Sequence, residues 1–315
     1  INNPEMTGLD TIVEFVIYIN MLTFPVSAIG WTASMIQRAA ASQKRLNEFL
    51  HTKPTIQSTG GKDTGALQGN IAFKNVDFVY PHTNIHAIKN FSLQIKPGEK
   101  VAVVGRTGSG KSTIAQLLLR MYDVSSGEIE IDGLPLHKLS VPSLRRFVSY
   151  VPQDGFLFSD TIEANIAFGA ETGGAMTVQQ AAHLAVVDKE IDRFPEGYQT
   201  LVGERGVTLS GGQKQRISIA RALMKEAPVL VLDDCLSAVD TRTEKEILGH
   251  LNNFLTGKTA IIITHRIFSL LNFDKIIVLQ DGAIAEQGTH YELLAQKGLY
   301  AEMYARQQQE EHNNN

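Results

Sequence analysis

The stretch VAVVGRTGSGKSTIAQLLLRM at residues 101–121 decides the fold. Its apolar run at 101–105 is typical of a buried strand, and the residues after Lys111 have the pattern of a helix. Between them, GRTGSGKS at 105–112 has the strand–loop–helix context that a phosphate-binding P-loop requires. The glycines let backbone N–H groups turn toward phosphate oxygens, and the start of the helix adds positive potential. The stretch therefore predicts a site for ATP or GTP.

Three residues, Lys111, Ser112 and Asp233, complete the predicted phosphate and magnesium site. Lys111 would reach the β- and γ-phosphates, and Ser112 would ligate Mg²⁺. The run VLVLDD ends at Asp233 and Asp234, and a carboxylate at the end of a buried strand beside a P-loop holds the magnesium shell. Asp233 fits that role. The loop residues expected to contact the nucleotide are Gly105, Arg106, Thr107, Gly108, Ser109, Gly110, Lys111, Ser112 and Thr113.

A second cradle for phosphate lies about a hundred residues further on. LSGGQ at 209–213 runs into the helical stretch KQRISIARAL, so that Gly211 and Gly212 offer backbone N–H groups at a helix start. One nucleotide does not need two cradles on the same chain. We therefore expect a head-to-tail dimer, in which Ser210, Gly211, Gly212 and Gln213 act on the nucleotide of the partner chain.

The rest of the chain after residue 69 predicts an α/β fold. Alternating stretches at 70–80 and 91–95 indicate antiparallel strands. Apolar runs at 229–233 and 260–264 indicate buried parallel strands with helices between them. We expect a P-loop core with an antiparallel β subdomain and a helical subdomain at about 156–224. The motifs do not repeat, which predicts a single nucleotide domain.

The first fifty residues differ in kind from the rest. From Leu9 to Trp31 the chain is strongly apolar, interrupted by Asp10, Glu14 and Asn20, and a helical pattern continues to Leu50. About 20 apolar residues cross a bilayer, and the basic residues that follow place the C-terminal end in the cytoplasm. We expect one membrane helix of a larger bundle, with a kink at its proline, Pro25. The alternative is an amphipathic helix of a soluble protein.

These patterns divide the chain into four parts. They are a membrane helix with a cytoplasmic extension at 1–52, a linker at 53–69, a nucleotide-binding domain at 70–305 and a polar tail at 306–315. The polar composition of residues 307–315 predicts disorder. The formal net charge of −4, with no basic block, argues against a general nucleic-acid binder.

With the motifs in this order, the sequence resembles the ATP-binding cassette (ABC) family over nearly all of residues 70–305. Tyr80 in FVYP resembles the aromatic residue that stacks on adenine, and Gln153 in YVPQD the Q-loop glutamine that touches Mg²⁺ and faces the membrane domain. SAVD at 237–240 resembles the D-loop that crosses the dimer interface. His265 in ITHR resembles the switch histidine near the γ-phosphate. VGERG at 202–206 resembles an exporter-type loop that senses the membrane domain.

The resemblance, joined to the preceding helix, implies the C-terminal part of an exporter half. It implies an ATPase that couples closure of two nucleotide domains to export of an unidentified substrate, with ATP and Mg²⁺ as cofactors. Its partner would be a second half-transporter. The protein would be a multi-pass protein of the cell membrane, with its nucleotide domain in the cytoplasm. The catalytic residues carried over are Lys111, Gln153, Asp234 and His265.

One position departs from the family pattern. After the magnesium aspartate the family has glutamate, which positions or deprotonates the attacking water, whereas this chain has Asp234. The shorter side chain retracts the carboxylate by about 1.5 Å, and a misplacement of about 1 Å can cost on the order of a hundredfold in rate. This departure favours the weakened site of a heterodimeric exporter. A working homodimer, a regulatory ATP-binding subunit and a soluble cassette protein of DNA repair or translation remain alternatives.

Three other features have simpler interpretations. His82 and His86 flank a polar turn and do not predict a metal site. Cys235 is expected to be a small packed residue. The spaced charges of EKEILGH at 244–250 predict one solvated face of a helix.

Overall fold

A computed structural model describes residues 8–56, 65, 67–170, 174–203, 206, 208–266 and 273–313. The chain separates into two compact units, divided after Thr55. Most of the predicted linker, residues 57–64 and 66, lies outside the described residues.

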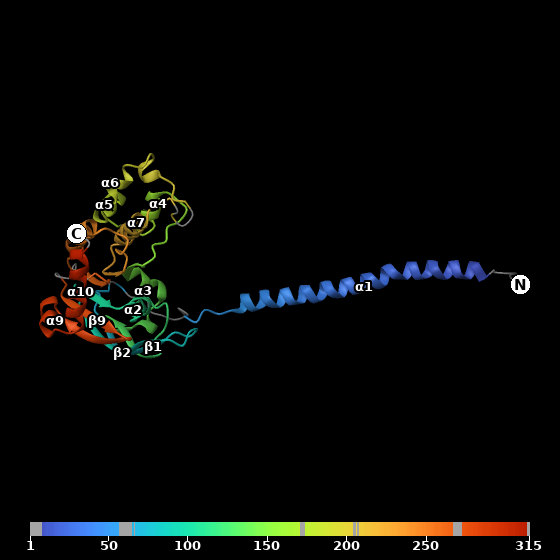
Figure 1. Ribbon diagram of the computed structural model, residues 1–315, viewed down its shortest axis with the longest axis horizontal. Coiled ribbons are helices and arrows are strands. Elements are labelled where there is room, and N and C mark those ends of the chain that lie inside the picture. Colours follow the sequence, from blue (N-terminus) through green and yellow to red (C-terminus); the bar gives the residue numbers. More distant parts are fainter. Residues whose placement is uncertain are drawn as a thin grey trace. The chain divides into compact units, whose positions relative to one another are not determined.

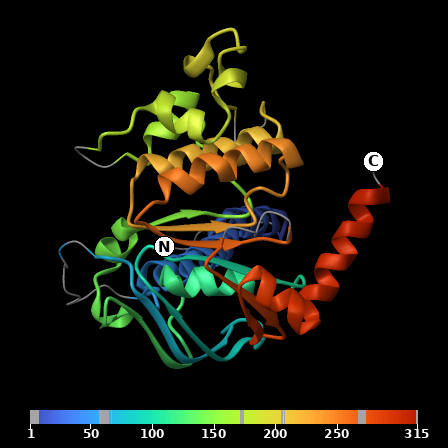
Figure 2. The same ribbon diagram turned by 90° about the vertical axis from the view of Figure 1, so that its left-hand side faces the viewer.

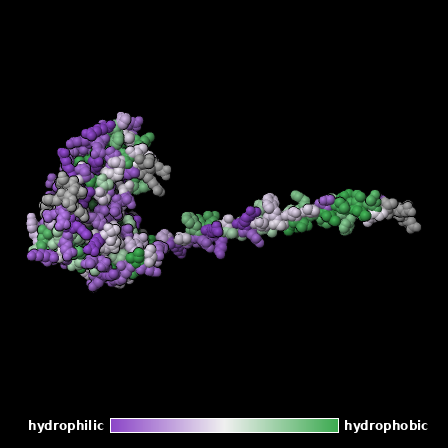
Figure 3. Space-filling view, viewed as in Figure 1, coloured by the Kyte–Doolittle hydropathy of each residue, from purple (hydrophilic) through white to green (hydrophobic). Residues whose placement is uncertain are grey.

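The first unit is a single helix, α1, at Gly8–His51 (Figure 1). Its 44 residues correspond to about 66 Å at the standard rise per residue. It is long and apolar enough to cross a membrane, and none of its side chains is buried within the chain. Figure 3 shows that its hydrophobic surface is concentrated toward the N-terminal end. Pro25 lies inside α1, which stays helical on both sides of it.

The second unit is built on a six-stranded sheet with the strand order β10-β9-β3-β8-β7-β6. Its central strands are parallel, and β10 joins β9 antiparallel at one edge. In sequence order the strands are β3 Lys100–Gly105, β6 Val148–Val151, β7 Val229–Asp233, β8 Thr259–Ile263, β9 Lys275–Gln280 and β10 Ala283–Gly288.

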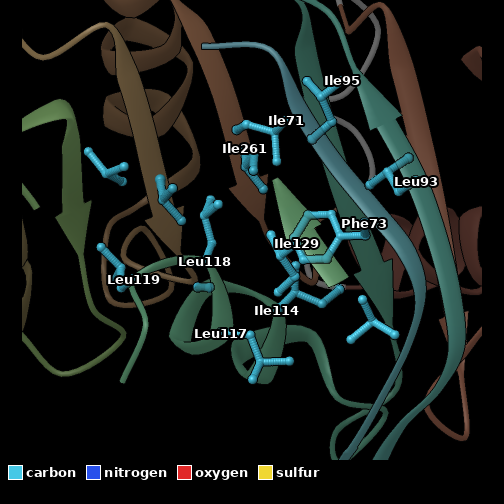
Figure 4. Packing of buried hydrophobic residues seen from close by; sticks show 14 of the residues in the cluster. Ile71, Phe73, Leu93, Ile95, Ile114, Leu117, Leu118, Leu119, Ile129 and Ile261 are labelled. Atoms are coloured by element: carbon cyan, nitrogen blue, oxygen red, sulfur yellow. The ribbon is translucent and has the colours of Figure 1, made fainter. Parts of the chain in front are cut away.

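A smaller antiparallel sheet with the order β2-β1-β4-β5 covers one side of this core. Its strands are β1 Ile71–Val79, β2 His86–Ile95, β4 Ser126–Ile131 and β5 Leu134–Pro135. The helix after the P-loop, α2 at Lys111–Leu118, packs in one hydrophobic cluster with both sheets. Figure 4 shows Ile114 and Leu117 of α2 beside Phe73 and Ile129 of the smaller sheet. This packing fixes α2, and with it the P-loop, against two layers.

Short helices form the other side of the six-stranded sheet, where Figure 2 shows α7 and α8 above the strands. Successive residues of β7 point to opposite faces, so Val229 and Val231 join the cluster around α2, while Leu230 and Leu232 join the helical cluster. The helices and turns between β5 and β8 are η1 Leu136–Lys138, α3 Val141–Phe147, α4 Ile162–Ala167, α5 Val178–Leu184, α6 Asp188–Ile191, η2 Gly197–Gln199, α7 Gly211–Met224 and α8 Thr241–Phe254. The predicted α/β class, with a P-loop core and a long apolar N-terminal helix, is confirmed.

The C-terminal segment differs from the prediction. Two helices, α9 at His290–Gln296 and α10 at Leu299–Asn313, end the described chain, so the disorder expected from residue 307 is wrong through Asn313. Alanine, arginine, glutamine and glutamate are good helix formers. The helix is also held at its start, where the Glu286 carboxylate accepts the N–H groups of Leu299 and Tyr300 at 2.5 and 3.0 Å. The polar composition of the segment does not indicate these hydrogen bonds to Glu286, so the sequence did not predict the helix.

Candidate nucleotide-binding site

The P-loop follows β3 and bends closely against neighbouring backbone. A Cβ atom on Gly105 would lie 2.4 Å from the carbonyl oxygen of Leu279, and one on Gly110 would lie 2.5 Å from that of Ala87. Gly110 also has a φ of +99° where it precedes α2. Only glycine fits these two positions without moving the strands. The loop shape is therefore set by contacts on both sides of it.

Lys111 is the first residue of α2, and its side chain is turned back over the loop. Its Nζ donates to the carbonyl oxygens of Gly105 and Arg106 at 2.8 and 2.9 Å, and the residue is 6% exposed. Burial lowers the pKa of Lys111, and the charges of Asp234 and Asp233 oppose that shift. The ammonium group has neutral carbonyls as hydrogen-bond partners, which an anionic phosphate oxygen can replace with a stronger, charge-assisted bond.

The next residue pairs with the first acidic residue of VLVLDD. Ser112 Oγ donates to Asp233 Oδ1 at 2.9 Å, and Tyr150 OH donates to Asp233 Oδ2 at 3.2 Å. Asp233 is 2% exposed, and burial raises the pKa of its carboxyl group against the lowering effect of these two hydrogen bonds. A hydroxyl and a carboxylate side by side, close to a phosphate cradle, are oxygen ligands of the kind Mg²⁺ prefers. The residues present thus fit magnesium bound together with phosphates.

Asp234 lies beside the two loop residues that were predicted to share its site. Gln153 Nε2 donates to Asp234 Oδ2 at 3.2 Å, and His265 Nε2 lies 4.0 Å from the same oxygen. Burial raises the pKa of Asp234 and lowers that of His265, which Lys111 lowers further. The carboxylate therefore faces an amide donor and an imidazole that favours its neutral form. An arrangement of this kind can orient a water molecule and accept its proton.

These groups meet because they end neighbouring strands. Gly105 ends β3, Asp233 ends β7, His265 follows β8 and Gln153 follows β6, and these four strands are adjacent and parallel. The carboxyl ends of parallel strands lie at one edge of a sheet, where open α/β folds bind ligands.

Tyr80 follows β1 and leans against α2. Its OH forms hydrogen bonds of 2.9 Å with Thr113 Oγ1 and with Gln116 Oε1. Its ring meets Phe78 and Tyr122 edge to face, at centroid distances of 4.8 and 5.4 Å. The side chain is half-buried at the rim of the P-loop helix, so part of the ring remains accessible.

The second predicted cradle begins α7. Ser210 is its N-cap, and Ser210 and Gln213 form a reciprocal capping box. Gln213 also donates to Glu190 at 3.0 Å. A Cβ atom on Gly212 would lie 2.9 Å from the carbonyl oxygen of Ala238, so the helix start packs on the 237–240 segment. No hydrogen bond within the described part of the chain joins 210–213 to the P-loop of the same chain. In the VGERG motif, Glu204 and Arg205 lie outside the described residues.

Sequence reasoning missed several side chains around the 237–240 segment. Glu244 was expected on a solvated helix face, but it is 3% exposed and pairs with Arg266. That expectation is wrong for this residue, because Glu244, Ile247 and Leu251 share one helix face, and all three are buried. Their spacing was the available signal. Elsewhere, His86 lies 3.0 Å from Asp77 Oδ1, and no metal-binding cluster of histidine, cysteine or acidic residues occurs within the described ranges.

Comparison with known proteins agrees with this geometry. Residues 88–237 match the family described as ABC transporter. The chain is 43% identical over 306 residues to the probable multidrug resistance ABC transporter ATP-binding/permease protein YheI of Bacillus subtilis, covering 96% of this chain and 52% of that protein. It is 40% identical over 310 residues to the ATP-dependent lipid A-core flippase of Dechloromonas aromatica, covering 98% and 53%.

A solved structure is similar along nearly the whole chain. The structure of a bacterial Atm1-family ABC exporter with ATP bound matches with a TM-score of 0.82 and 40% identity, over 92% of this chain and 51% of that one. The chain thus spans about half the length of the relatives it matches. The sheet-edge site and these similarities agree: residues 88–237 belong to a nucleotide-binding domain of the ABC transporter family.

Proposed function

We propose that this chain is an ATP-binding and ATP-hydrolysing subunit of a dimeric ABC exporter. ATP-driven closure of two nucleotide domains would be coupled to export across the cell membrane, with α1 as one of several membrane-crossing helices. The observation that carries the proposal is the grouping of Lys111, Ser112 and Asp233 at the end of the parallel strands. The relatives include a multidrug transporter and a lipid flippase. The proposal therefore concerns the ATP-driven step that such proteins share.

Each group would have one task when ATP is bound. The P-loop N–H groups and Lys111 would hold the phosphates, Tyr80 would stack on adenine, and Ser112 and Asp233, with Gln153, would hold Mg²⁺. The metal would neutralise charge that develops on the phosphate oxygens. His265 and Asp234 would orient the attacking water, and Asp234 would accept its proton. The segment 210–213 would contact the nucleotide on the partner chain.

We further propose that the chain's own site is weakened and that its partner is a different half-transporter. The support is the length of Asp234: its carboxylate already contacts Gln153 and approaches His265, and it is about 1.5 Å shorter than the glutamate of the family pattern. A water held at the position that suits glutamate would be beyond the optimal reach of Asp234. A working homodimer would also retain His265. The rate of ATP hydrolysis therefore decides between a weakened heterodimeric site and a working homodimer.

The test is steady-state ATP hydrolysis by the intact protein in nanodiscs, compared with its Asp234→Glu and Asp234→Asn variants. We expect ATP binding in all three, slow turnover in the parent, and a rate at least about tenfold higher with glutamate, because about 1 Å of misplacement costs up to about a hundredfold. The asparagine variant keeps the size of the side chain and removes the base, so it should be slower than the parent. Thermal unfolding checks that all three are folded.

Each alternative predicts a different result. If the parent turns over near ~1 s⁻¹ and glutamate adds nothing, the site is not weakened and a homodimer explains the chain better. If neither the parent nor the glutamate variant hydrolyses ATP although both bind it, the chain is a regulatory subunit. Absence of ATP binding would contradict the proposed function altogether.

A further inference from the structure

The segment 237–240, which follows Asp234 and leads into α8, is exposed but tightly held. Ser237, Ala238 and Asp240 are exposed, whereas Val239 is 4% exposed. Exposed backbone groups can be satisfied by water, so a loop of this kind does not need protein partners for its polar atoms. Two side chains from distant parts of the chain nevertheless bind it.

The first of these side chains is Gln215 on α7. Its Oε1 accepts the N–H of Ala238 at 3.0 Å, and its Nε2 donates to Ser237 Oγ at 3.2 Å. The same Nε2 lies 3.5 Å from the carbonyl oxygen of Gln153. Gln215 is 7% exposed. One buried amide therefore joins the helix of the LSGGQ motif, the segment 237–240 and the Gln153 loop.

The second side chain is Arg266, which directly follows His265. Its Nη1 donates to the carbonyl oxygen of Val239 at 3.0 Å, and its Nη2 donates to that of Ser237 at 3.2 Å. The guanidinium also pairs with the buried Glu244 in the first turn of α8. A buried carboxylate without its cation is costly, so this pair holds Arg266 in place.

We propose that Gln215 and Arg266 are positioning residues that tie the segment 237–240 to the Gln153 and His265 loops. This inference rests on the proposed function: in the proposed dimer, the segment 237–240, which resembles the D-loop, would lie at the interface with the partner chain. A displacement of 237–240 by the partner chain would then be transmitted through the side chains of Gln215 and Arg266 to the Gln153 and His265 loops. It would thereby set the positions of Gln153 and His265 relative to Asp234. The two residues themselves would touch neither nucleotide nor metal.

The experiment measures kcat and KM for ATP with the intact dimer in nanodiscs. The variants are Gln215→Met, which keeps the size of the side chain without its hydrogen bonds, Arg266→Gln and the double variant. We expect kcat to fall about tenfold or more, because the hydrolytic groups lose their geometry, while KM stays within about twofold because the phosphate contacts remain. Since both residues act on one loop, the double variant should lose little more than the more severe single variant.

Two controls separate positioning from general stability. Gln215→Glu keeps the acceptor for the Ala238 N–H and loses only the donor to Ser237 Oγ, whose own hydrogen goes to the carbonyl oxygen of Asp234, so it should retain more of kcat than Gln215→Met, which lacks both. Arg120→Gln removes another buried arginine, whose partners are Asp123 and the carbonyl oxygens of Leu136 and Leu139, outside the segment 237–240 and the Gln153 and His265 loops. It should lower the unfolding temperature without a selective loss of kcat.

An unchanged kcat in folded Gln215→Met and Arg266→Gln protein would overturn the inference, and so would a fall matched by Arg120→Gln. If the unmodified dimer did not hydrolyse ATP, the proposed function would fail. The inference would still be judged by hydrogen exchange of the Ala238 amide, which must speed up in both Gln215→Met and Arg266→Gln. Unchanged exchange would reject it independently of turnover.

Discussion

At position 234 the backbone conformation favours aspartate, whereas the proposed hydrolytic role favours the longer glutamate. The residue has a φ of 47°, in the left-handed region that aspartate and asparagine tolerate better than most residues. Its carboxylate, in contrast, is one methylene shorter than that of a glutamate, and we propose that this limits its reach to the attacking water. The Asp234→Glu variant should therefore gain reach at a small cost in backbone strain, which is why its folding must be followed together with its rate.

Asp233 carries a different conflict, between stability and ligand binding. Because burial raises its carboxyl pKa, the ionised group destabilises the folded, nucleotide-free protein at neutral pH. We predict that Asp233→Asn raises the unfolding temperature of that state at pH 7.5. The gain should shrink as the pH falls through the raised pKa toward the usual aspartate range, where the parent carboxyl becomes protonated in both states.

The measurement is thermal unfolding with and without Mg-ATP. The parent should gain stability from the ligand, about 2.7 kcal/mol at a hundredfold excess over Kd, and Asp233→Asn should gain much less. An Asp233→Asn protein that is less stable than the parent without ligand would contradict the predicted burial cost.

Individual residues were predictable from the sequence where a motif fixes them by local spacing. Lys111 and Ser112 follow from the loop, and Asp233 follows from the end of a buried strand; the structure brings all three together. Gln215 and Arg266 were not predictable, because their partners lie 22 to 62 and 22 to 29 positions away along the chain, respectively. Only the packed fold determines which loop a buried glutamine meets.

At the scale of elements, the C-terminal helix α10 belongs to the folded domain. Tyr300 is fully buried, and its OH lies 2.7 Å from Nδ1 of the buried His290 in α9. Toward its other end, Gln307 donates to the carbonyl oxygen of His265. The helix thus joins the sheet edge at β10 to the loop that carries the predicted switch histidine. Strand and helix types were predictable from periodicity, whereas this docking depends on contacts that composition does not encode.

The His290–Tyr300 contact predicts a pH dependence. Burial lowers the pKa of His290, so the folded state favours the neutral ring and the unfolded state binds a proton more readily. Stability from this site is present above the usual histidine pKa and is lost as the pH falls below it. We expect His290→Gln to show a smaller fall in unfolding temperature between pH 7.5 and 5.5 than the parent. Parallel falls in the two proteins would rule out this origin.

At the scale of the whole molecule, the chain contains two units that differ in how they bury their apolar side chains. The α/β unit buries its own clusters, whereas α1 leaves its apolar side chains, such as Phe15, Ile19 and Phe24, without cover from the chain. A surface of this kind is stable in a bilayer or in contact with other helices. Length and hydropathy predicted this division.

We therefore expect the intact chain to need detergent or lipid, and a chain lacking residues 1–52 to stay in solution without either. Sedimentation of both forms after detergent removal measures the difference. The unmodified chain should pellet and the shortened one should remain in the supernatant. If both stay in solution as single species, the membrane assignment of α1 fails and the amphipathic helix of a soluble protein becomes the better account.

The burial of Cys235 has a practical consequence for site-directed labelling of this protein. It is the single cysteine of the sequence and is 1% exposed, and burial raises the pKa of its thiol, so the reactive thiolate is scarce. Maleimide dyes and spin labels should therefore pass over it in the folded chain. A reporter cysteine placed at an exposed position such as Ile85 or Tyr291 can then be labelled without first rebuilding the core. Residues 1–315 are therefore already a nearly blank background for spectroscopic distance measurements between paired chains.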